Sequence, residues 1–145
     1  MTSGFKISEA DPDTHYDTLV ALQEACFPGS TLWPPEGAHW WIARDRDGGA
    51  IGFAGLYIEN HDYGQAMLCR SGVLQRARGY GLQRDLIRVR ERKAKLLGLT
   101  RITTYTAADN SHSMNNLIAC GYRTYEPPRG WASEGCVYWQ KILSV

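Results

Sequence analysis

A glycine-rich turn within residues 73–83 joins a candidate strand to the start of an amphipathic helix. Such a turn leaves several backbone N–H groups unpaired at the positive end of a helix dipole. Gly79 and Gly81 carry no side chain, so an anion can approach these N–H groups closely. The chemistry favoured by this arrangement is the binding of a phosphate or pyrophosphate group.

The turn does not fit two well-known nucleotide-binding motifs. A P-loop requires Gly-Lys-Ser/Thr, which is absent here. A dinucleotide-binding fingerprint requires a third glycine, which Gly79-Tyr80-Gly81-Leu82-Gln83-Arg84 does not contain. An ATPase or a dehydrogenase is therefore disfavoured.

The spacing of apolar residues along the chain predicts a mixed sheet flanked by helices, with the turn between one strand and one helix. Strands are expected at residues 5–8, 40–43, 50–58, 65–74, 101–106 and 137–143. Helices are expected from Tyr16 to Cys26, from Leu82 to Gly98, and from Asn110 or Ser111 to Gly121. Ser71 and Gly72 interrupt one strand, which indicates a bulge or a close backbone approach there.

Length and composition indicate a single domain over residues 1–145. A chain of 145 residues with 43% hydrophobic content suits one core and is too short for two ordinary domains. The longest nearly apolar run, residues 50–58, is too short to span a membrane, and no secretory signal is visible. We therefore expect a cytoplasmic protein. The four cysteines and four histidines are dispersed, so we expect no metal site.

A cluster of basic residues follows the turn, although the net charge is only +1. Asp85 and Glu91 interleave with the cluster, which favours a solvated helix face over a nucleic-acid-binding surface. We expect neither a nucleic acid nor a membrane as a partner. The basic residues are Arg84, Arg88, Arg90, Arg92, Lys93 and Lys95.

The turn resembles the acetyl-CoA-binding motif of the GNAT superfamily of N-acetyltransferases, whose pattern is Arg/Gln-x-x-Gly-x-Gly/Ala. Arg78-Gly79-Tyr80-Gly81-Leu82-Gln83 matches all but the last position, where Gln83 replaces a small residue. The overlapping register Arg76-Ala77-Arg78-Gly79-Tyr80-Gly81 matches fully. We prefer the first register because it places Val73 at the apolar end of the family's fourth strand.

A second match lies downstream at the family's mutual spacing. It resembles an asparagine, a small residue, a tyrosine, a glycine and an aromatic residue, here Asn110, Ser113, Leu117, Gly121 and Tyr122. The resemblance implies an α/β (α+β) fold with a mixed, mostly antiparallel sheet of six to seven strands. This sheet would be splayed between its fourth and fifth strands and flanked by about four helices.

The resemblance also implies how acetyl-CoA is held. Val73 and the residues after it would pair through their backbones with the pantetheine arm, and residues 79–84 would hold the pyrophosphate with their N–H groups. Asn110 would bind the pantetheine arm, although a plain helix cap explains this residue equally well. The implied cofactor-binding residues are Val73, Leu74, Gln75, Arg78, Gly79, Tyr80, Gly81, Leu82, Gln83, Arg84, Asn110 and Leu117.

The implied reaction is direct attack of a primary amine on the thioester in a ternary complex. The Val73 N–H would stabilise the oxyanion. The family's usual general acid is a tyrosine at the position of Leu117, and leucine cannot donate a proton. Glu59, Tyr105 and Ser113 are the side chains considered for proton transfer, each with a packing or solvated role as the plainer explanation.

The acceptor side would be formed by the first helix, the turn after it and a later aromatic segment. The residues assigned to it are Phe27, Trp33, Tyr57, Arg70, Ser71 and Trp131. The acceptor would be a small-molecule amine or a protein amine. A homodimer is common in this family, and no segment here requires one. The alternative function is a non-catalytic acyl-CoA-binding or regulatory module of the same fold, favoured by Leu117.

Overall fold

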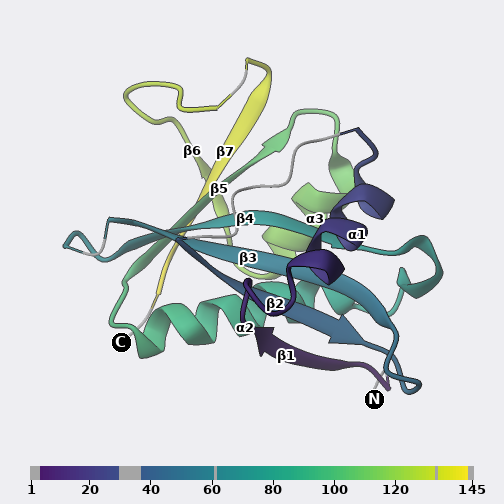
Figure 1. Ribbon diagram of the computed structural model, residues 1–145. Coiled ribbons are helices and arrows are strands. Elements are labelled where there is room, and N and C mark those ends of the chain that lie inside the picture. The colour runs from purple at the N-terminus through teal and green to yellow at the C-terminus, as the bar shows by residue number, and fades with distance from the viewer. Residues whose placement is uncertain (1–3, 30–36, 61, 133, 144–145) are drawn as a thin grey trace.

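The strands of the described residues form one sheet in the order β1-β2-β3-β4-β5-β7-β6 (Figure 1). The computed structural model describes residues 4–29, 37–60, 62–132 and 134–143. The strands are β1 (Lys6–Ala10), β2 (Ala38–Arg44), β3 (Ala50–Asn60), β4 (Gln65–Val73), β5 (Arg101–Ala107), β6 (Arg123–Tyr125) and β7 (Cys136–Ile142). Neighbouring strands are antiparallel except β4 and β5, which are parallel. The predicted mixed, mostly antiparallel sheet is confirmed.

The sheet splits between β4 and β5. These strands pair only where Gln65, Ala66 and Met67 face residues 101–103, and the rest of β4 has no partner on this side among the described residues. Figure 1 shows β5, β6 and β7 turning away from the other strands. The predicted splay between the fourth and fifth strands is therefore present.

A bulge interrupts β4 just after the splay opens. Ser71 pairs with Ala54 and Leu68 pairs with Leu56, so Cys69 and Arg70 lie opposite the single residue Gly55. Two residues opposite one is the arrangement of a β-bulge, which bends the strand and increases its twist. The bulge lies two residues before the predicted Ser71–Gly72 position. Gly72 instead provides the other predicted feature, a close approach.

Among the described residues, three α-helices cover the sheet: α1 (Tyr16–Cys26), α2 (Leu82–Leu96) and α3 (Ser111–Ala119). A short 3-10 turn, η1 (Gln75–Ala77), precedes α2. About four helices were expected, and residues 30–36, between α1 and β2, lie outside the described residues. No helix within the described ranges is long and apolar enough to cross a membrane.

Two hydrophobic clusters fix the helices on opposite faces of the sheet. Leu19 and Leu22 of α1 pack with Trp40 and Phe53. A second cluster joins α2, α3 and the other sheet face, and its members include Leu82, Leu86, Leu117, Trp41, Leu56 and Trp139. The tryptophans of β2 and β7 are therefore core residues, as predicted, and Figure 1 shows α1 and α2 on different sides of the sheet.

The predicted solvated basic face of α2 is wrong at one position. Arg84, Arg88, Arg92 and Lys95 are exposed, but Arg90 is only 2% exposed. Arg90 follows Leu82 by eight residues and Leu86 by four, so it lies on the buried stripe of the helix. The guanidinium of Arg90 is therefore buried in the protein interior.

Candidate active site

Three adjoining cavities connect the glycine turn to the bulge of β4. The turn cavity, about 300 Å³, lies against Gly79, Gly81 and Arg84. The splay cavity, about 430 Å³, lies against Phe27, Val73, Asn110 and neighbouring residues. The bulge cavity, about 220 Å³, lies against Cys69, Arg70, Tyr105 and neighbouring residues. Gln83 lines all three cavities, so they adjoin one another along the splay, and this row of cavities is called the passage below.

The glycine turn is shaped by left-handed backbone conformations. Gly79 has φ +90° and Gly81, immediately before α2, has φ +81°. A Cβ added at either residue would meet nothing within 4 Å, so conformation rather than space requires glycine here. The side chain of Arg78 folds back, and its Nε donates to the Val73 carbonyl oxygen at 3.1 Å. The turn is thereby tied to the end of β4.

The end of β4 directs backbone donors into the splay. Leu74 N donates to Ile51 O at 2.8 Å, so Leu74 faces β3. Successive residues in an antiparallel ladder turn their N–H groups to opposite sides, so Val73 and Ser71 point theirs away from β3, toward the gap. The structure thus differs from the expectation at Leu74, whose N–H is already bonded, and Gln75 begins η1. Ser71 supplies the second outward donor.

The start of α3 forms the opposite wall of the splay. Asn110 Oδ1 accepts a hydrogen bond from Ser113 N at 3.2 Å, so the helix-cap interpretation of Asn110 is confirmed. Asn110 and Ser113 both line the bulge and splay cavities. Leu117 is 5% exposed and also lines the bulge cavity, so it contributes an apolar surface there. A role for Asn110 toward pantetheine stays a prediction.

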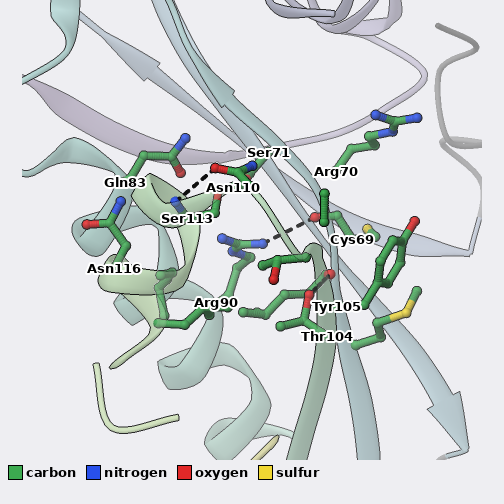
Figure 2. A pocket seen from close by; sticks show the side chains of 16 residues that line it. Cys69, Arg70, Ser71, Gln83, Arg90, Thr104, Tyr105, Asn110, Ser113 and Asn116 are labelled. Atoms are coloured by element: carbon green, nitrogen blue, oxygen red, sulfur yellow. Dashed lines mark hydrogen bonds between the residues drawn. The ribbon is translucent and has the colours of Figure 1, made fainter. Parts of the chain in front are cut away.

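Arg90 supports the bulge from beneath, as Figure 2 shows. Its Nη1 donates to Gly55 O at 3.1 Å and to Cys69 O at 3.5 Å, and its Nε donates to Leu86 O at 3.0 Å. Burial lowers the pKa of this guanidinium from its usual value, and the carbonyl oxygens compensate for lost water. Arg90 thus holds both strands at the bulge while lining its cavity.

Aromatic side chains form a wall beside the bulge cavity. Tyr105 meets Trp131 edge to face with centroids 5.4 Å apart, and Trp131 lies 5.0 Å from Tyr138. The Trp131 indole N–H donates to the Tyr125 hydroxyl at 3.3 Å. Across the cavity mouth, the Arg70 guanidinium stacks on the Phe27 ring at 5.2 Å. Phe27, Arg70 and Tyr105 line the splay and bulge cavities, and Trp131 packs against Tyr105 outside their linings; the roles predicted for these residues stay predictions.

Other predicted residues lie elsewhere. Glu59 is exposed, does not line the three cavities, and accepts hydrogen bonds from Thr103 Oγ1 at 3.0 Å and Gln65 Nε2 at 2.8 Å. Tyr57 is half-buried on β3 and also lies outside the cavity linings. Tyr80 is exposed and packs against Phe5, with centroids 5.7 Å apart. Trp33 lies outside the described residues.

Two other residues near the second motif are poor proton donors. Tyr122 is 3% exposed, and burial together with Glu91 raises the pKa of its hydroxyl strongly. Burial likewise raises the pKa of Cys120. Neither lines the three cavities. Of the three side chains predicted for proton transfer, Tyr105 and Ser113 line the passage and Glu59 does not.

Sequence reasoning missed several residues of the passage. His112 and Asn116 lie one helical turn apart on α3 and line the turn cavity, and Arg84 Nε donates to Asn116 Oδ1 at 3.0 Å. Their spacing around the predicted Ser113 could have identified this helix face. Thr104 lines the bulge cavity and donates its Oγ1 hydrogen to Leu68 O at 3.0 Å. Its position, one residue before Tyr105, carried no separate signal.

No cluster of metal-binding side chains occurs in the part of the chain that the structure describes. The glycine turn at the start of α2 and the outward N–H groups of β4 instead suit an extended ligand that carries negative charge. The residues of the two sequence motifs, the glycine turn and the start of α3, both line the passage.

Comparisons with known proteins agree with this geometry. The model of the acetyltransferase (GNAT) family matches residues 7–122. No curated protein matches the sequence. An acetyltransferase of Bacillus subtilis in complex with CoA has a similar structure, with TM-score 0.77 and 17% identity over 97% of this chain and 99% of that one.

Two further similar structures are N-acetyltransferases of different substrates. The ribosomal-protein-S18-alanine N-acetyltransferase of Escherichia coli has TM-score 0.75 and 13% identity, covering 97% of this chain and 95% of that one. The spermidine/spermine N-acetyltransferase of Vibrio cholerae, in mutant forms, has TM-score 0.77 and 13% identity over the same shares. At these identities the likeness concerns the fold, whereas the family-model match covers most of the sequence. The chain belongs to the GNAT family of acetyltransferases.

Proposed function

We propose that the protein transfers an acetyl group from acetyl-CoA to a primary amine by direct attack in a ternary complex. The observation that carries this proposal is the row of adjoining cavities from the glycine turn, along the splay, to the bulge of β4. Such a passage suits a ligand that carries phosphate groups at one end and an acyl group at the other.

The residues of the passage fit coenzyme A. The turn offers N–H groups at the start of α2, with open space where glycine side chains would lie. Arg78 and Arg84 line the turn cavity and add positive charge for the phosphates. The outward N–H groups of Ser71 and Val73 suit the amide groups of a pantetheine arm, which would add to β4 like a further strand.

The reaction requires that an amine nitrogen bond to the acetyl carbon while the carbon–sulfur bond breaks. Acetyl-CoA supplies the activated thioester. The Val73 N–H, which points into the splay, would stabilise the developing oxyanion. Tyr105 lines the acceptor end of the bulge cavity and would orient the water that takes the amine's proton, whereas Ser113 on α3 would hold the water that gives a proton to the departing sulfur. Each step leaves the protein unchanged after one turnover.

A second candidate is a binding module that holds acyl-CoA without turnover. Leu117 favours it, because an apolar side chain lies where the resemblance places a proton donor. Turnover remains chemically reasonable with Leu117, since water can protonate a thiolate.

The test is thiol release from acetyl-CoA in the presence of a broad amine panel, together with the melting temperature with and without acetyl-CoA. Saturation at about 100 times Kd adds roughly 2.7 kcal/mol, which should raise Tm by several degrees. Amine-dependent thiol release with a raised Tm supports the transferase. A raised Tm without release for any amine supports the binding module, and the absence of both contradicts the two proposals together.

A further inference from the structure

The bulge cavity has two chemically different ends. Figure 2 shows Arg70 and Tyr105 on one side, and Gln83, Asn110 and Asn116 on the other. The second group lies toward the glycine turn, the end assigned above to coenzyme A. The Arg70 and Tyr105 end is therefore the one an acceptor would meet.

The charge at this end is positive. The linings of the three cavities contain four arginines and no carboxylate within the described ranges. Arg78 and Arg84 lie at the turn, and Arg90 is occupied by backbone carbonyl oxygens. Arg70 is the remaining cation, and no carboxylate of the described residues forms an ion pair with it. The Arg70 guanidinium lies over the Phe27 ring, 5.2 Å from its centroid, and this cation–π contact helps to hold the side chain.

The apolar surface at this end is aromatic and fixed. Tyr105, which lines the bulge cavity, is 43% exposed, and Trp131, which packs against Tyr105 outside the cavity lining, is 40% exposed. Tyr138 stands behind Trp131, and its hydroxyl accepts a hydrogen bond from Ala132 N at 3.0 Å. Held rings bind an aromatic group with little loss of side-chain entropy.

We propose that the acceptor is a small amine that carries both a carboxylate and an aromatic ring, a proposal that rests on the transferase function above. The carboxylate pairs with Arg70, whose planar guanidinium matches two carboxylate oxygens. The ring packs against Tyr105 and Trp131. A polyamine would bring several positive charges to a cavity with arginines and without carboxylates, which opposes binding.

The same charge assists the chemistry. A nearby cation disfavours the protonated form of an amine, so Arg70 and Arg90 lower the acceptor's pKa and increase its neutral, nucleophilic fraction. Arg70 thus serves both the binding and the activation of the acceptor. An amine without an anionic group would gain the activation but lose the ion pair.

The test compares kcat/KM for matched amines in the wild type. The pairs are L-phenylalanine with 2-phenylethylamine, and 4-(aminomethyl)benzoate with benzylamine, which place the carboxylate near and far from the amine; spermidine is the polycation. We expect the carboxylate member of at least one pair to be preferred by about 10-fold or more, because a charge-assisted hydrogen bond has roughly this value. Spermidine should be the poorest acceptor.

Two variants assign the preference to the named residues. Arg70→Gln should abolish the preference for the carboxylate, because it lowers kcat/KM more for the carboxylate member of a pair than for the uncharged partner. Trp131→Ala should lower kcat/KM for both members of a pair by about 10-fold, since it removes ring contact. The matched control is Arg88→Gln, an exposed arginine of α2 outside the three cavities, which should change neither.

Preference for spermidine or for the carboxylate-free amines would overturn the inference while leaving the transferase intact, and so would an unchanged preference in Arg70→Gln. No turnover of any amine, with acetyl-CoA still raising Tm, would instead contradict the transferase itself. The two failures are therefore distinguishable.

Discussion

The Nη1 atom of Arg90 lies 3.1 Å from the carbonyl oxygen of Gly55, directly opposite the bulge of β4. Gly55 leaves no room for a side chain, because a Cβ there would lie 2.5 Å from Cys69 Sγ and 2.8 Å from the Trp40 ring. One helix residue and one close glycine therefore hold the bent strand. Since α2 begins at the glycine turn, the same helix joins the proposed phosphate end of the passage to the bulge.

Replacing Arg90 should destabilise the protein and weaken its cofactor site. Arg90→Met leaves the carbonyl oxygens of Gly55 and Cys69 without their donor, which costs about 2 kcal/mol in the free energy of unfolding. Urea denaturation measures this cost, and isothermal titration should show weaker acetyl-CoA binding. The control is Arg88→Met on the exposed face of α2, expected to stay within about 0.5 kcal/mol of wild type. Equal effects of the two variants would contradict a special role for Arg90.

Two glycines with the same conformation separate strain from function. Gly81 at the start of α2 has φ +81°, and Gly98 just after its end has φ +79°, with open space at both. Gly81→Ala and Gly98→Ala should each cost about 1 to 2 kcal/mol of stability, because an L-residue is strained in the left-handed region. Only Gly81→Ala should also weaken acetyl-CoA binding, measured by titration. Similar loss of binding in both variants would indicate a general effect of stability.

Most of the fold could be predicted because the spacing of apolar residues indicates strands and helices, and the positions of glycines indicate turns. β6 has only three residues, Arg123–Tyr125, which is too short for a pattern to locate. Of the two features that the sequence allows at Ser71 and Gly72, the structure has the close approach there, and the bulge lies two residues earlier. A Cβ at Gly72 would lie 2.8 Å from Cys26 Sγ, so this glycine admits α1 rather than forming the bulge.

The part of the site that consists of backbone N–H groups in the glycine turn could be predicted from the sequence. The parts that depend on how strands pair or on which helix face is buried could not. Leu74 and Val73 differ in N–H direction only through the pairing of β4 with β3, which no single-strand pattern reveals. Arg90 was assigned to solvent from its charge, although its spacing from Leu86 places it on the buried face. Position on the helix outweighed residue type there because carbonyl oxygens were available to receive the guanidinium.

The thiol of Cys69 should react slowly at neutral pH. Burial raises its pKa from the usual 9.0 to about 11. Because only the thiolate is nucleophilic, about one molecule in a thousand is reactive near pH 8, and the alkylation rate should rise about tenfold per pH unit up to about pH 10. Peptide mapping after iodoacetamide treatment measures the rate at Cys69, with the urea-unfolded protein as the control. A native midpoint near 9.0 would contradict burial of the thiol.

Introducing a proton donor at position 117 should speed turnover if departure of the thiolate limits it. Leu117 lines the bulge cavity and is 5% exposed, so a larger ring there costs about 1 to 3 kcal/mol through overpacking. Leu117→Phe carries nearly the same ring without the hydroxyl and is the matched control. We expect kcat of Leu117→Tyr to exceed that of Leu117→Phe by about 10-fold or more, measured by thiol release with the best acceptor of the amine panel. Equal kcat values in two folded variants would mean that water already protonates the leaving sulfur fast enough, and Leu117 would then be a tolerated replacement rather than a defect.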